Sequence, residues 1–302
     1  MSGTRHPSVA IILVNYKGRE DTRECLDSLR RLTYPAHSVI VVCQPPDDGT
    51  AEAVRREFPE VRVIENRENN GFAGGNNVGM RSALDGGADY VFLLNNDTTV
   101  APDLLEPLVA LAGSDGRIGI VGPKMLYHGE PDTIWSAGAR IDARARVTRM
   151  GDGEKDDAGG QAEAPRDVDF IVGCGLLARR AVLEEIGLLD EQFFLYFEET
   201  DLCARARRAG WRVVYQPAAR LWHKVSRSTG VDSPLTLYYM WRNALLYLAR
   251  HGTRRARLQT ILEALRLALV WTAQRKADRR RVLLRAVADY LRGRFGKAEG
   301  IV

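Results

Sequence analysis

Three groups of polar residues in this chain have the types and positions that could do chemistry, and the first follows an apolar run. Residues 90–94 are apolar, and the run stops at Asn95, Asn96 and Asp97. Such a run predicts a buried strand, and α/β sheets bind ligands at the carboxyl ends of their strands. Asn95 and Asp97 could therefore supply oxygen ligands to a divalent cation, with phosphate and water completing the coordination shell. An Asx turn after the strand accounts for the same residues, and both interpretations stay open at this point.

The second group is a cluster of carboxylates, Glu198, Glu199 and Asp201, at the start of a helix that we expect over residues 198–208. Carboxylates in a first helical turn stabilise the positive end of the helix dipole, which is the simplest interpretation. The cluster also follows four aromatic residues within positions 193–197. An aromatic, partly desolvated environment raises the pKa of a carboxylate toward the range that suits a general base.

The third group contains His223 and Arg227, which come after a strand predicted over residues 210–215. A lone histidine is more often structural than a ligand, although imidazole is an acceptable ligand for Mn²⁺. Arg227 lies in a segment of Ser, Arg and Gly residues and could contact a diphosphate.

The elements that must position these groups alternate between strand and helix. The apolar patterns predict strands over residues 8–14, 38–43 and 61–64, with helices over residues 19–32 and 50–58 between them. This alternation indicates parallel strands joined by right-handed crossovers, and thus an α/β fold.

A glycine- and asparagine-rich run over residues 68–79 leads into the next helix, which we expect to continue through Leu84. Small residues at a helix N-terminus let the backbone approach a phosphate closely. The run is neither a Walker sequence nor a good GxGxxG, and it follows the third strand instead of the first. These departures argue against a dinucleotide-dependent dehydrogenase.

The composition, with 45% hydrophobic and 27% charged residues, is typical of a globular protein. Four cysteines (Cys25, Cys43, Cys174 and Cys203) lie far apart without CxxC spacing, so neither a disulfide scaffold nor a zinc site is indicated. No run of about eighteen uncharged apolar residues predicts a transmembrane helix. We expect a cytoplasmic protein, with peripheral association at the inner face of the cell membrane as an open alternative.

The charge is unevenly distributed along the chain. Residues 250–297 contain fourteen Lys or Arg against three Asp or Glu, which is a net charge of +11. Because the whole chain has a net charge of +4, the remaining residues carry a net charge of −7. Two amphipathic stretches in this tail have apolar positions at Leu258, Ile261, Leu262, Leu265 and Leu269, and at Leu283, Val287, Tyr290 and Leu291. Such basic amphipathic helices suit an anionic membrane surface, packing on the body of the protein, or a homodimer. No nucleic-acid recognition motif accompanies them.

Four motifs, taken in order, resemble family 2 glycosyltransferases of the GT-A fold, and most closely the bacterial rhamnosyltransferase-like members. They are Asn15-Tyr16, Asn70-Gly-Phe-Ala-Gly-Gly-Asn-Asn77, Leu93-Leu-Asn-Asn-Asp-Thr98 and the aromatic–acidic run over residues 193–203. The resemblance covers about residues 9–243. It implies a Rossmann-like, mostly parallel sheet flanked by helices, in a catalytic domain over residues 1–248. The nucleotide-binding half would reach to about residue 100, the acceptor half would follow, and residues 249–302 would form a C-terminal helical extension.

The resemblance also implies an activity, namely inverting transfer of a sugar, with rhamnose as one candidate, from a nucleotide-diphosphate donor. The donor could be dTDP-, UDP- or GDP-linked, the cofactor would be Mg²⁺ or Mn²⁺, and the acceptor would be a saccharide or a lipid-linked hydroxyl in cell-surface glycan synthesis. Cys43 and Asn95 stand where the family usually has carboxylates. A non-catalytic protein that binds nucleotide sugars is therefore the alternative.

Residue roles carry over by position. Asp97 matches the metal-binding carboxylate of the family's DxD motif, and His223 matches a residue that completes the metal or diphosphate site. Glu199 matches the catalytic base, with Asp201 as the other candidate. The donor-binding candidates are Asn15, Tyr16, Gln44, Asn70, Gly71, Gly74, Asn76, Asn95, Asn96, Gly173, Cys174 and Arg227. Gln44 is included because its amide can both donate to and accept from a pyrimidine edge.

Overall fold

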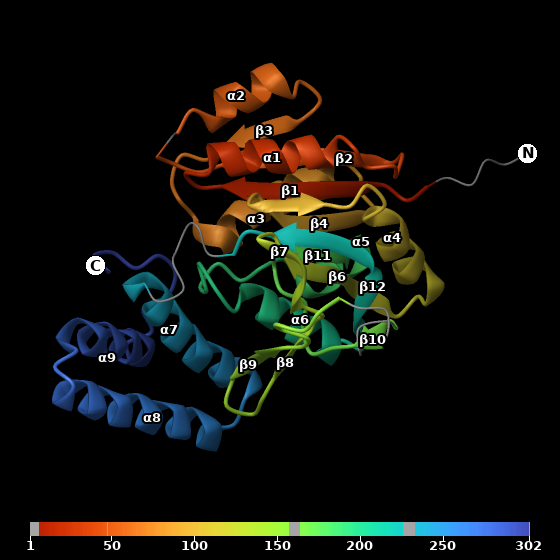
Figure 1. The fold of residues 1–302 in the computed structure, drawn as a ribbon. Coiled ribbons are helices and arrows are strands. Elements are labelled where there is room, and N and C mark those ends of the chain that lie inside the picture. The colour runs from red at the N-terminus through yellow and green to blue at the C-terminus, as the bar shows by residue number, and fades with distance from the viewer. Residues whose placement is uncertain (1–5, 47, 157–163, 226–232, 302) are drawn as a thin grey trace, which may run out of the picture.

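The apolar runs in the first hundred residues form parallel strands of one sheet (Figure 1). The computed structural model describes residues 6–46, 48–156, 164–225 and 233–301. Four strands lie in the order β4-β1-β2-β3, and each neighbouring pair is parallel. These strands and their connecting helices are β1 (Val9–Asn15), α1 (Arg19–Leu29), β2 (His37–Cys43), α2 (Thr50–Glu57), β3 (Arg62–Glu65), α3 (Gly71–Asp85) and β4 (Tyr90–Asn95).

The order of these strands reverses between β1 and β4. The chain adds β2 and β3 on one side of β1 and then places β4 on its other side. Open α/β sheets bind ligands at the carboxyl ends of the strands next to such a reversal. Asn15 ends β1 and Asn95 ends β4, so the chemistry-bearing residues after both strands lie at this edge.

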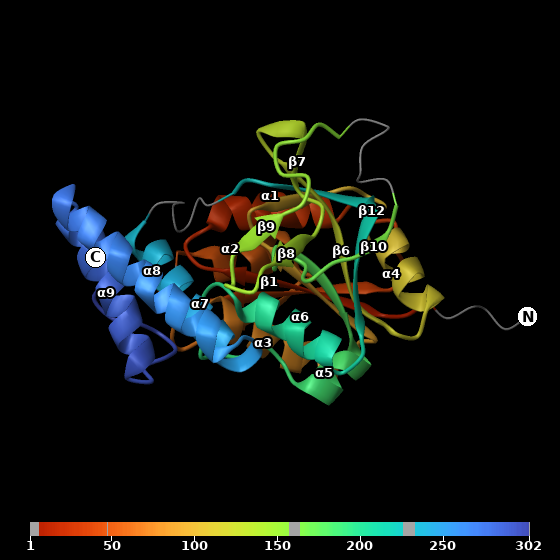
Figure 2. The same cartoon turned by 90° about the horizontal axis from the view of Figure 1, so that it is seen from below.

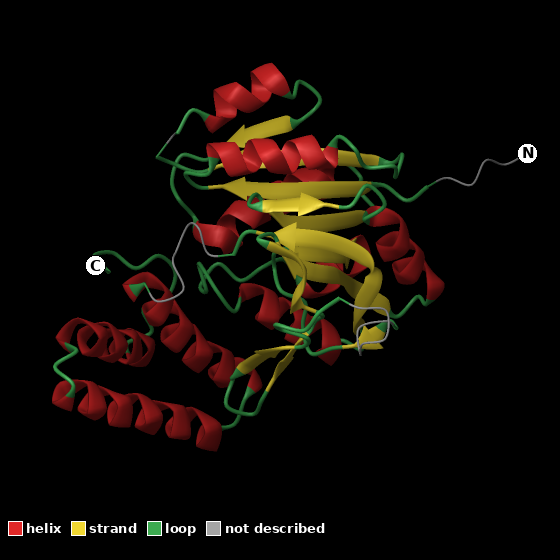
Figure 3. Cartoon of the chain, in the orientation of Figure 1, coloured by secondary structure: helices red, strands yellow, loops and turns green. Residues whose placement is uncertain are grey.

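The second half of the sheet is mixed. Strand β11 (Gly175–Arg179) runs antiparallel between β4 and β6 (Ile118–Tyr127), and β12 (Arg212–His223) runs parallel to β6. Helices flank the central sheet (Figure 3). The remaining elements of this half are β5 (Thr98–Val100), α4 (Leu105–Ser114), β7 (Glu130–Ser136), β8 (Ala139–Ile141), β9 (Val147–Arg149), β10 (Arg166–Asp167), α5 (Arg180–Ile186) and α6 (Glu198–Arg208).

Two elements differ from the sequence-based expectation. Residues 130–136, where the sequence analysis predicts no strand, form β7 and pair with β6. The strand predicted over residues 210–215 continues as β12 to His223, with a register shift between Gln216 and Arg220. Pro217 interrupts the strand pattern at this bulge, which is why the alternation in the sequence ended too early. The extension matters because it carries His223 to β5, beside Thr98.

Two of the glycines in the glycine-rich run serve helix–sheet packing. A Cβ added to Gly75 would lie 2.8 Å from Val14, and one added to Gly79 would lie 2.5 Å from Ile12. Both contacts are with β1, so larger residues would push α3 away from the sheet. The helix begins at Gly71, which means that most of the run is inside the helix and not in a phosphate-binding loop.

The C-terminal part contains α7 (Pro234–His251), α8 (Arg254–Ala273) and α9 (Ala277–Leu291), which lie together beyond one end of the sheet (Figures 1 and 2). The predicted boundary after residue 248 falls within α7. Small residues on α8, among them Ala256, Ala264 and Ala268, are buried against the neighbouring helices. None of the helices in the described ranges is long and apolar enough to cross a membrane.

Candidate functional site

The site begins with a close pair, Asp97 and His223, at the carboxyl edge of the sheet. Asp97 Oδ1 lies 3.1 Å from His223 Nε2, and both side chains are mostly buried. Burial alone would raise the pKa of Asp97, but the interaction with His223, and more weakly with Lys224, lowers it below its usual value. Asp97 is therefore ionised at neutral pH.

This pair fits one half of a divalent-cation site. Asp97 Oδ1 is buried and accepts no hydrogen bond from the described residues, although His223 is at ion-pair distance. The Asn95 amide, whose Nδ2 lies 3.4 Å from His223 Nε2, can donate to that nitrogen in its unprotonated form. Two ligands at a right angle on one cation, with bonds of about 2.1 Å, lie about 3 Å apart, as these two atoms do. Within the described ranges no three His, Cys, Asp or Glu residues form a group that could hold a metal.

Asparagine side chains brace the ends of β1 and β4. Asn15 Oδ1 accepts hydrogen bonds from Gly18 N, Thr22 Oγ1 and Asn96 Nδ2 at 3.0 to 3.1 Å. Asn96 Nδ2 also donates to Thr22 Oγ1 at 2.9 Å. Asn15 and Asn96, both predicted to bind the donor, therefore hold the β4 turn against α1 and fix the backbone on which Asp97 sits.

Gln44 is bonded to the start of α3. Its Nε2 donates to the carbonyl of Gly71 at 3.0 Å, and its Oε1 accepts from the N–H of Asn70 at 2.8 Å. Both amide atoms thus have backbone partners, so Gln44 positions these residues in this structure. Gly71 is needed here because its φ is +68° and a Cβ would lie 2.3 Å from the carbonyl oxygen of Phe194.

Glu199 lies in the first turn of α6, and the chain near it contacts the end of β4, which precedes Asp97. The backbone N–H of Asn95 donates to the carbonyl of Cys174 at 3.2 Å. Gly173 precedes Cys174, and its backbone, together with those of Glu199 and Thr200, lowers the pKa of the Glu199 carboxyl. A Cβ added to Gly173 would lie 3.1 Å from the Phe72 ring and in ordinary contact, at 3.6 Å, with the Cβ of Glu199.

Burial raises the pKa of Glu199, and the hydrogen bonds from backbone N–H groups only partly oppose this. Its Oε2 is buried and has no hydrogen-bond partner among the described residues, so this oxygen can accept a proton. The neighbouring Glu198 is 3% exposed, and its pKa is raised still further, first by burial and then by the charge of Glu199. Glu198 therefore holds its proton when Glu199 is ionised.

Asp201 has a different environment from Glu199. Arg205 Nε donates to Asp201 Oδ2 at 2.7 Å, and His251 Nε2 lies 2.7 Å from Oδ1. Burial would raise the pKa of Asp201, but His251 and Arg205 lower it. Both oxygens are engaged, so this carboxylate joins α6 to the end of α7.

The aromatic segment before α6 has a strained backbone. Phe194, Tyr196 and Phe197 all have positive φ, at 63°, 68° and 74°. Such conformations each cost about 1–3 kcal/mol for residues with side chains and persist only when surrounding contacts enforce them. The segment immediately precedes Glu199, so its shape sets where that carboxylate lies.

Two buried residues of α7 enforce this shape, and neither was assigned to the site from the sequence. Asn243 Nδ2 donates to the carbonyls of Phe193, Leu195 and Tyr196 at 2.8 to 2.9 Å. Arg242 donates to the carbonyl of Phe193 at 3.0 Å and to that of Gln192 at 3.1 Å. A polar Arg-Asn pair within an apolar helical pattern is the signal in the sequence that such contacts exist.

The remaining predicted residues are more scattered. Tyr16 is 38% exposed just after β1, where its ring is accessible. Asn76 Nδ2 donates to its own helix at Phe72, and a Cβ on Gly74 would meet Asn70. Cys174 is buried with its thiol against Met125, and burial raises its pKa well above the usual range. Arg227 lies outside the described residues. All four cysteines are free, as predicted.

Comparison with known proteins identifies the family. The family model described as "Glycosyltransferase like family 2" matches residues 6–243. The chain belongs to this family. The resemblance seen in the sequence motifs is thereby confirmed, and the protein is a glycosyltransferase related to rhamnosyltransferases.

Individual relatives of this family 2 glycosyltransferase cover most of its length. It is 28% identical over 296 residues to the N-acetylglucosaminyl-diphospho-decaprenol L-rhamnosyltransferase of Mycobacterium tuberculosis. The alignment covers 90% of this chain and 96% of the relative. It is 26% identical over 245 residues to the low-salt glycan biosynthesis hexosyltransferase Agl10 of Haloferax volcanii, covering 79% and 74% of the two chains.

A solved structure confirms the expected GT-A fold. The mannosyltransferase PcManGT of Pyrobaculum calidifontis, determined in complex with GDP-Man and Mn²⁺, superimposes with a TM-score of 0.58 at 17% identity. The match covers 95% of this chain and 88% of the mannosyltransferase.

Proposed function

We propose that this glycosyltransferase moves a sugar, with rhamnose as the first candidate, from a nucleotide-diphosphate donor to a lipid-linked saccharide acceptor. The observation that carries the proposal is the Asp97–His223 pair at the strand-order reversal, joined through Asn95, Cys174 and Gly173 to a carboxylate of raised pKa. The name of the mycobacterial relative, which specifies rhamnosyl transfer to a diphospho-decaprenol saccharide, supports the sugar and the acceptor.

Asp97 and His223 would hold the cation, Mg²⁺ or Mn²⁺. The cation would neutralise the diphosphate that leaves the sugar. The lowered pKa of Asp97 keeps it ionised for this role, and the Asn95 amide lies beside His223 Nε2, whose lone pair would go to the cation when one is bound. Asn15 and Asn96 keep the turn in place, and the exposed ring of Tyr16 offers a surface on which the nucleotide base can stack.

Glu199 acts as the general base in a single displacement. The acceptor hydroxyl gives its proton to Glu199 Oε2 while its oxygen forms the new bond to the anomeric carbon, and the bond from that carbon to the diphosphate breaks. The backbone of Gly173 lies close enough to the carboxylate to lower its pKa, which partly offsets the effect of burial. Asp201, whose two oxygens are engaged by Arg205 and His251, serves the structure and not the chemistry.

An anionic membrane surface is the proposed location of the acceptor. The outer face of α8 exposes Leu258, Leu262, Leu265 and Leu269 by 43% to 71%, so packing on the body of the protein does not use these side chains. The tail around this face carries a net charge of +11, which attracts anionic lipid and opposes pairing of two tails in a homodimer. The leucines can enter the interface while Arg254 and Arg255 contact headgroups.

The experiment that tests the proposal is a thermal-shift screen of the full chain with dTDP-, UDP- and GDP-sugars, with Mn²⁺ or with EDTA. A ligand that binds only the native state raises the melting temperature by mass action. We expect one donor class to stabilise the protein, and to do so only with the metal. Stabilisation without any transfer to a matched acceptor would indicate the alternative, a protein that binds nucleotide sugars without catalysis. No stabilisation by any donor would contradict both.

A further inference from the structure

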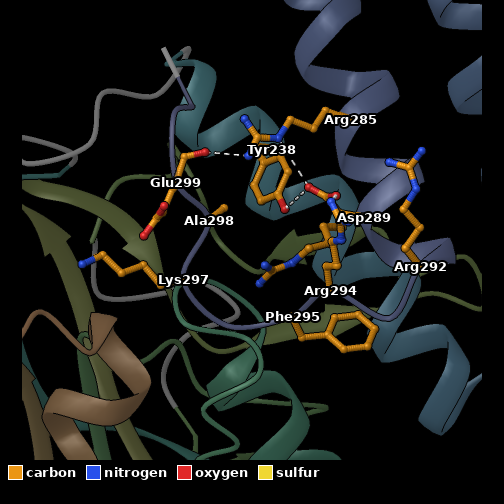
Figure 4. A pocket seen from close by; sticks show the side chains of 10 residues that line it. Tyr238, Arg285, Asp289, Arg292, Arg294, Phe295, Lys297, Ala298 and Glu299 are labelled. Atoms are coloured by element: carbon orange, nitrogen blue, oxygen red, sulfur yellow. Dashed lines mark hydrogen bonds and ion pairs between the residues drawn. The ribbon is translucent and has the colours of Figure 1, made fainter.

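A basic cavity lies between α7, α9 and the last residues of the chain, away from the Asp97–His223 pair. Its volume is about 420 Å³ (Figure 4). Two carboxylates, Asp289 and Glu299, line it together with five cationic side chains: Arg242, Arg285, Arg292, Arg294 and Lys297. The lining therefore has an excess of three positive charges. Small-molecule sites in proteins begin at about 300 Å³, so the cavity is large enough for an anionic group.

The inner wall of the cavity carries a buried cation, Arg242, which has no carboxylate partner among the described residues. Arg242 is 1% exposed, and its hydrogen bonds go to the Asn243 side chain and to the carbonyls of Gln192, Phe193 and Gly296. No described carboxylate is at ion-pair distance from it, and its guanidinium lies 4.7 Å from the centroid of the Tyr239 ring. Buried charges are normally paired, so this wall suits an anion.

The two carboxylates do not neutralise the whole lining. Asp289 accepts a hydrogen bond from the Tyr238 hydroxyl at 2.9 Å and lies 3.4 Å from Arg285 and 3.9 Å from Arg294. Arg292 and Lys297 lie on opposite sides of the residues drawn in Figure 4, and neither side chain has a hydrogen bond or an ion pair within the described part of the chain. These two cations are free to bind a ligand.

We propose that this cavity binds the phosphate or diphosphate group of the acceptor. An arginine guanidinium can donate two parallel N–H hydrogen bonds to two oxygens of one phosphate. Several cations around one cavity therefore suit a group with more than one negative charge. This assignment rests on the proposed function, in which the acceptor is lipid-linked. The donor's diphosphate would bind at a separate place, next to Asp97, which follows β4, and His223, which ends β12.

The cavity is linked to Glu199 along the chain. Arg242, which lines the cavity, also holds the carbonyl of Phe193, six residues before Glu199. Six residues span at most about 20 Å, and the turns of this segment shorten the separation. An acceptor whose phosphate lies in the cavity can therefore reach Glu199 with a saccharide. Occupancy by an anion would also reinforce the Arg242 contacts that shape the segment.

The first test measures anion binding without transfer. Inorganic diphosphate is titrated calorimetrically into the full chain in EDTA, so that no cation at Asp97 contributes. The cavity variant is Arg292→Ser with Lys297→Ser. The control, Arg266→Ser with Arg281→Ser, removes the same charge from exposed positions outside the cavity. We expect the cavity variant to lose affinity by about tenfold or more, since each lost charge-assisted hydrogen bond contributes about that factor. Equal affinity of the cavity variant and the control would overturn the proposal.

The second test separates the acceptor's phosphate from a lipid headgroup. The same variants are assayed with a saccharide acceptor that carries a diphosphate and with its uncharged glycoside, and they are also tested for sedimentation with phosphatidylglycerol vesicles. We expect the cavity variant to raise KM for the phosphorylated acceptor by about tenfold, with kcat and the uncharged acceptor unaffected. Loss of vesicle binding with both KM values unchanged would assign the cavity to a headgroup and refute the acceptor. The rise in the protein's melting temperature with a donor sugar, measured in the thermal-shift screen, does not depend on this result and tests the proposed function alone.

Discussion

Replacement of Asn243 by alanine tests whether α7 shapes the active site. Asn243 is fully buried and donates to the carbonyls of Phe193, Leu195 and Tyr196 at 2.8 to 2.9 Å. Alanine would leave these three acceptors without that donor. The Phe193 carbonyl keeps its hydrogen bond from Arg242, but the Leu195 and Tyr196 carbonyls become unsatisfied. A buried polar group left unsatisfied costs about 1–3 kcal/mol, so the native state should lose about 2 kcal/mol or more if the segment keeps its shape.

The segment can instead relax, because its three positive-φ residues store strain that Asn243 helps to enforce. Relaxation would recover part of the lost stability and would move Glu199. A displacement of about 1 Å of a catalytic group lowers turnover by about 100-fold. We therefore expect Asn243→Ala to lower kcat by about that factor, while donor affinity stays unchanged because Asp97 and His223 lie on other elements.

Leu245→Ala is the matched control. Leu245 is fully buried in the same helix, but it packs with α8 and α9 and not with the segment. Its truncation should cost about 2–5 kcal/mol of unfolding free energy with little change in kcat. The assay combines urea unfolding with steady-state transfer at a temperature where both variants are folded. The reasoning about the segment is refuted if Asn243→Ala keeps the wild-type kcat. It is also refuted if the two variants have the same unfolding free energy and the same loss of kcat.

Three further predictions concern the metal ligand, the base and the tail. Asp97→Ala should abolish Mn²⁺-dependent donor binding in calorimetry with little loss of stability; unchanged affinity in a folded variant would remove Asp97 from the metal site. Glu199→Gln should lower kcat by about 10² to 10⁴ while donor binding persists, and Asp201→Asn should mainly lower stability; the reverse pattern would make Asp201 the base. Wild-type kcat should rise with pH as Glu199 ionises, with a midpoint above the ordinary glutamate pKa because burial raises it. The same raised pKa means that its protonation contributes stability at low pH that is lost as pH rises through the folded value. Leu262→Gln with Leu269→Gln should reduce sedimentation with anionic vesicles by about tenfold or more, since each inserted leucine contributes about 1.5–3 kcal/mol, without changing the melting temperature. A change from dimer to monomer with unaltered vesicle binding would show that this face is a subunit interface.

The parts of the fold that could be predicted depend on local sequence patterns. The strands of the parallel half and the helix over residues 198–208 follow from apolar runs and from a cluster of first-turn carboxylates. The position of Asp97 just after a buried strand could be predicted because strand ends are marked in the sequence, and its metal-binding role stays a prediction. The outward-facing leucines of α8 were also visible, although the sequence did not show whether the protein would cover them.

The parts that could not be predicted depend on contacts between distant residues. Asn243 meets the aromatic segment about fifty positions earlier, and Asp201 meets His251 fifty positions later. Gln44 looked like a residue that could read a base, but its amide fits the backbone of Asn70 and Gly71. A composition or a period carries no information about which polar groups will find one another after the chain folds.

The central claim, metal-dependent single displacement with Glu199 as the base, is tested most directly by following the transfer itself. The donor found in the thermal-shift screen is incubated with an acceptor, and nucleoside diphosphate release is measured together with the anomeric configuration of the product by NMR. We predict release that requires Mn²⁺ or Mg²⁺, a product of inverted configuration, and loss of both in Glu199→Gln. Transfer that proceeds equally in EDTA, or a product with retained configuration, would contradict the account.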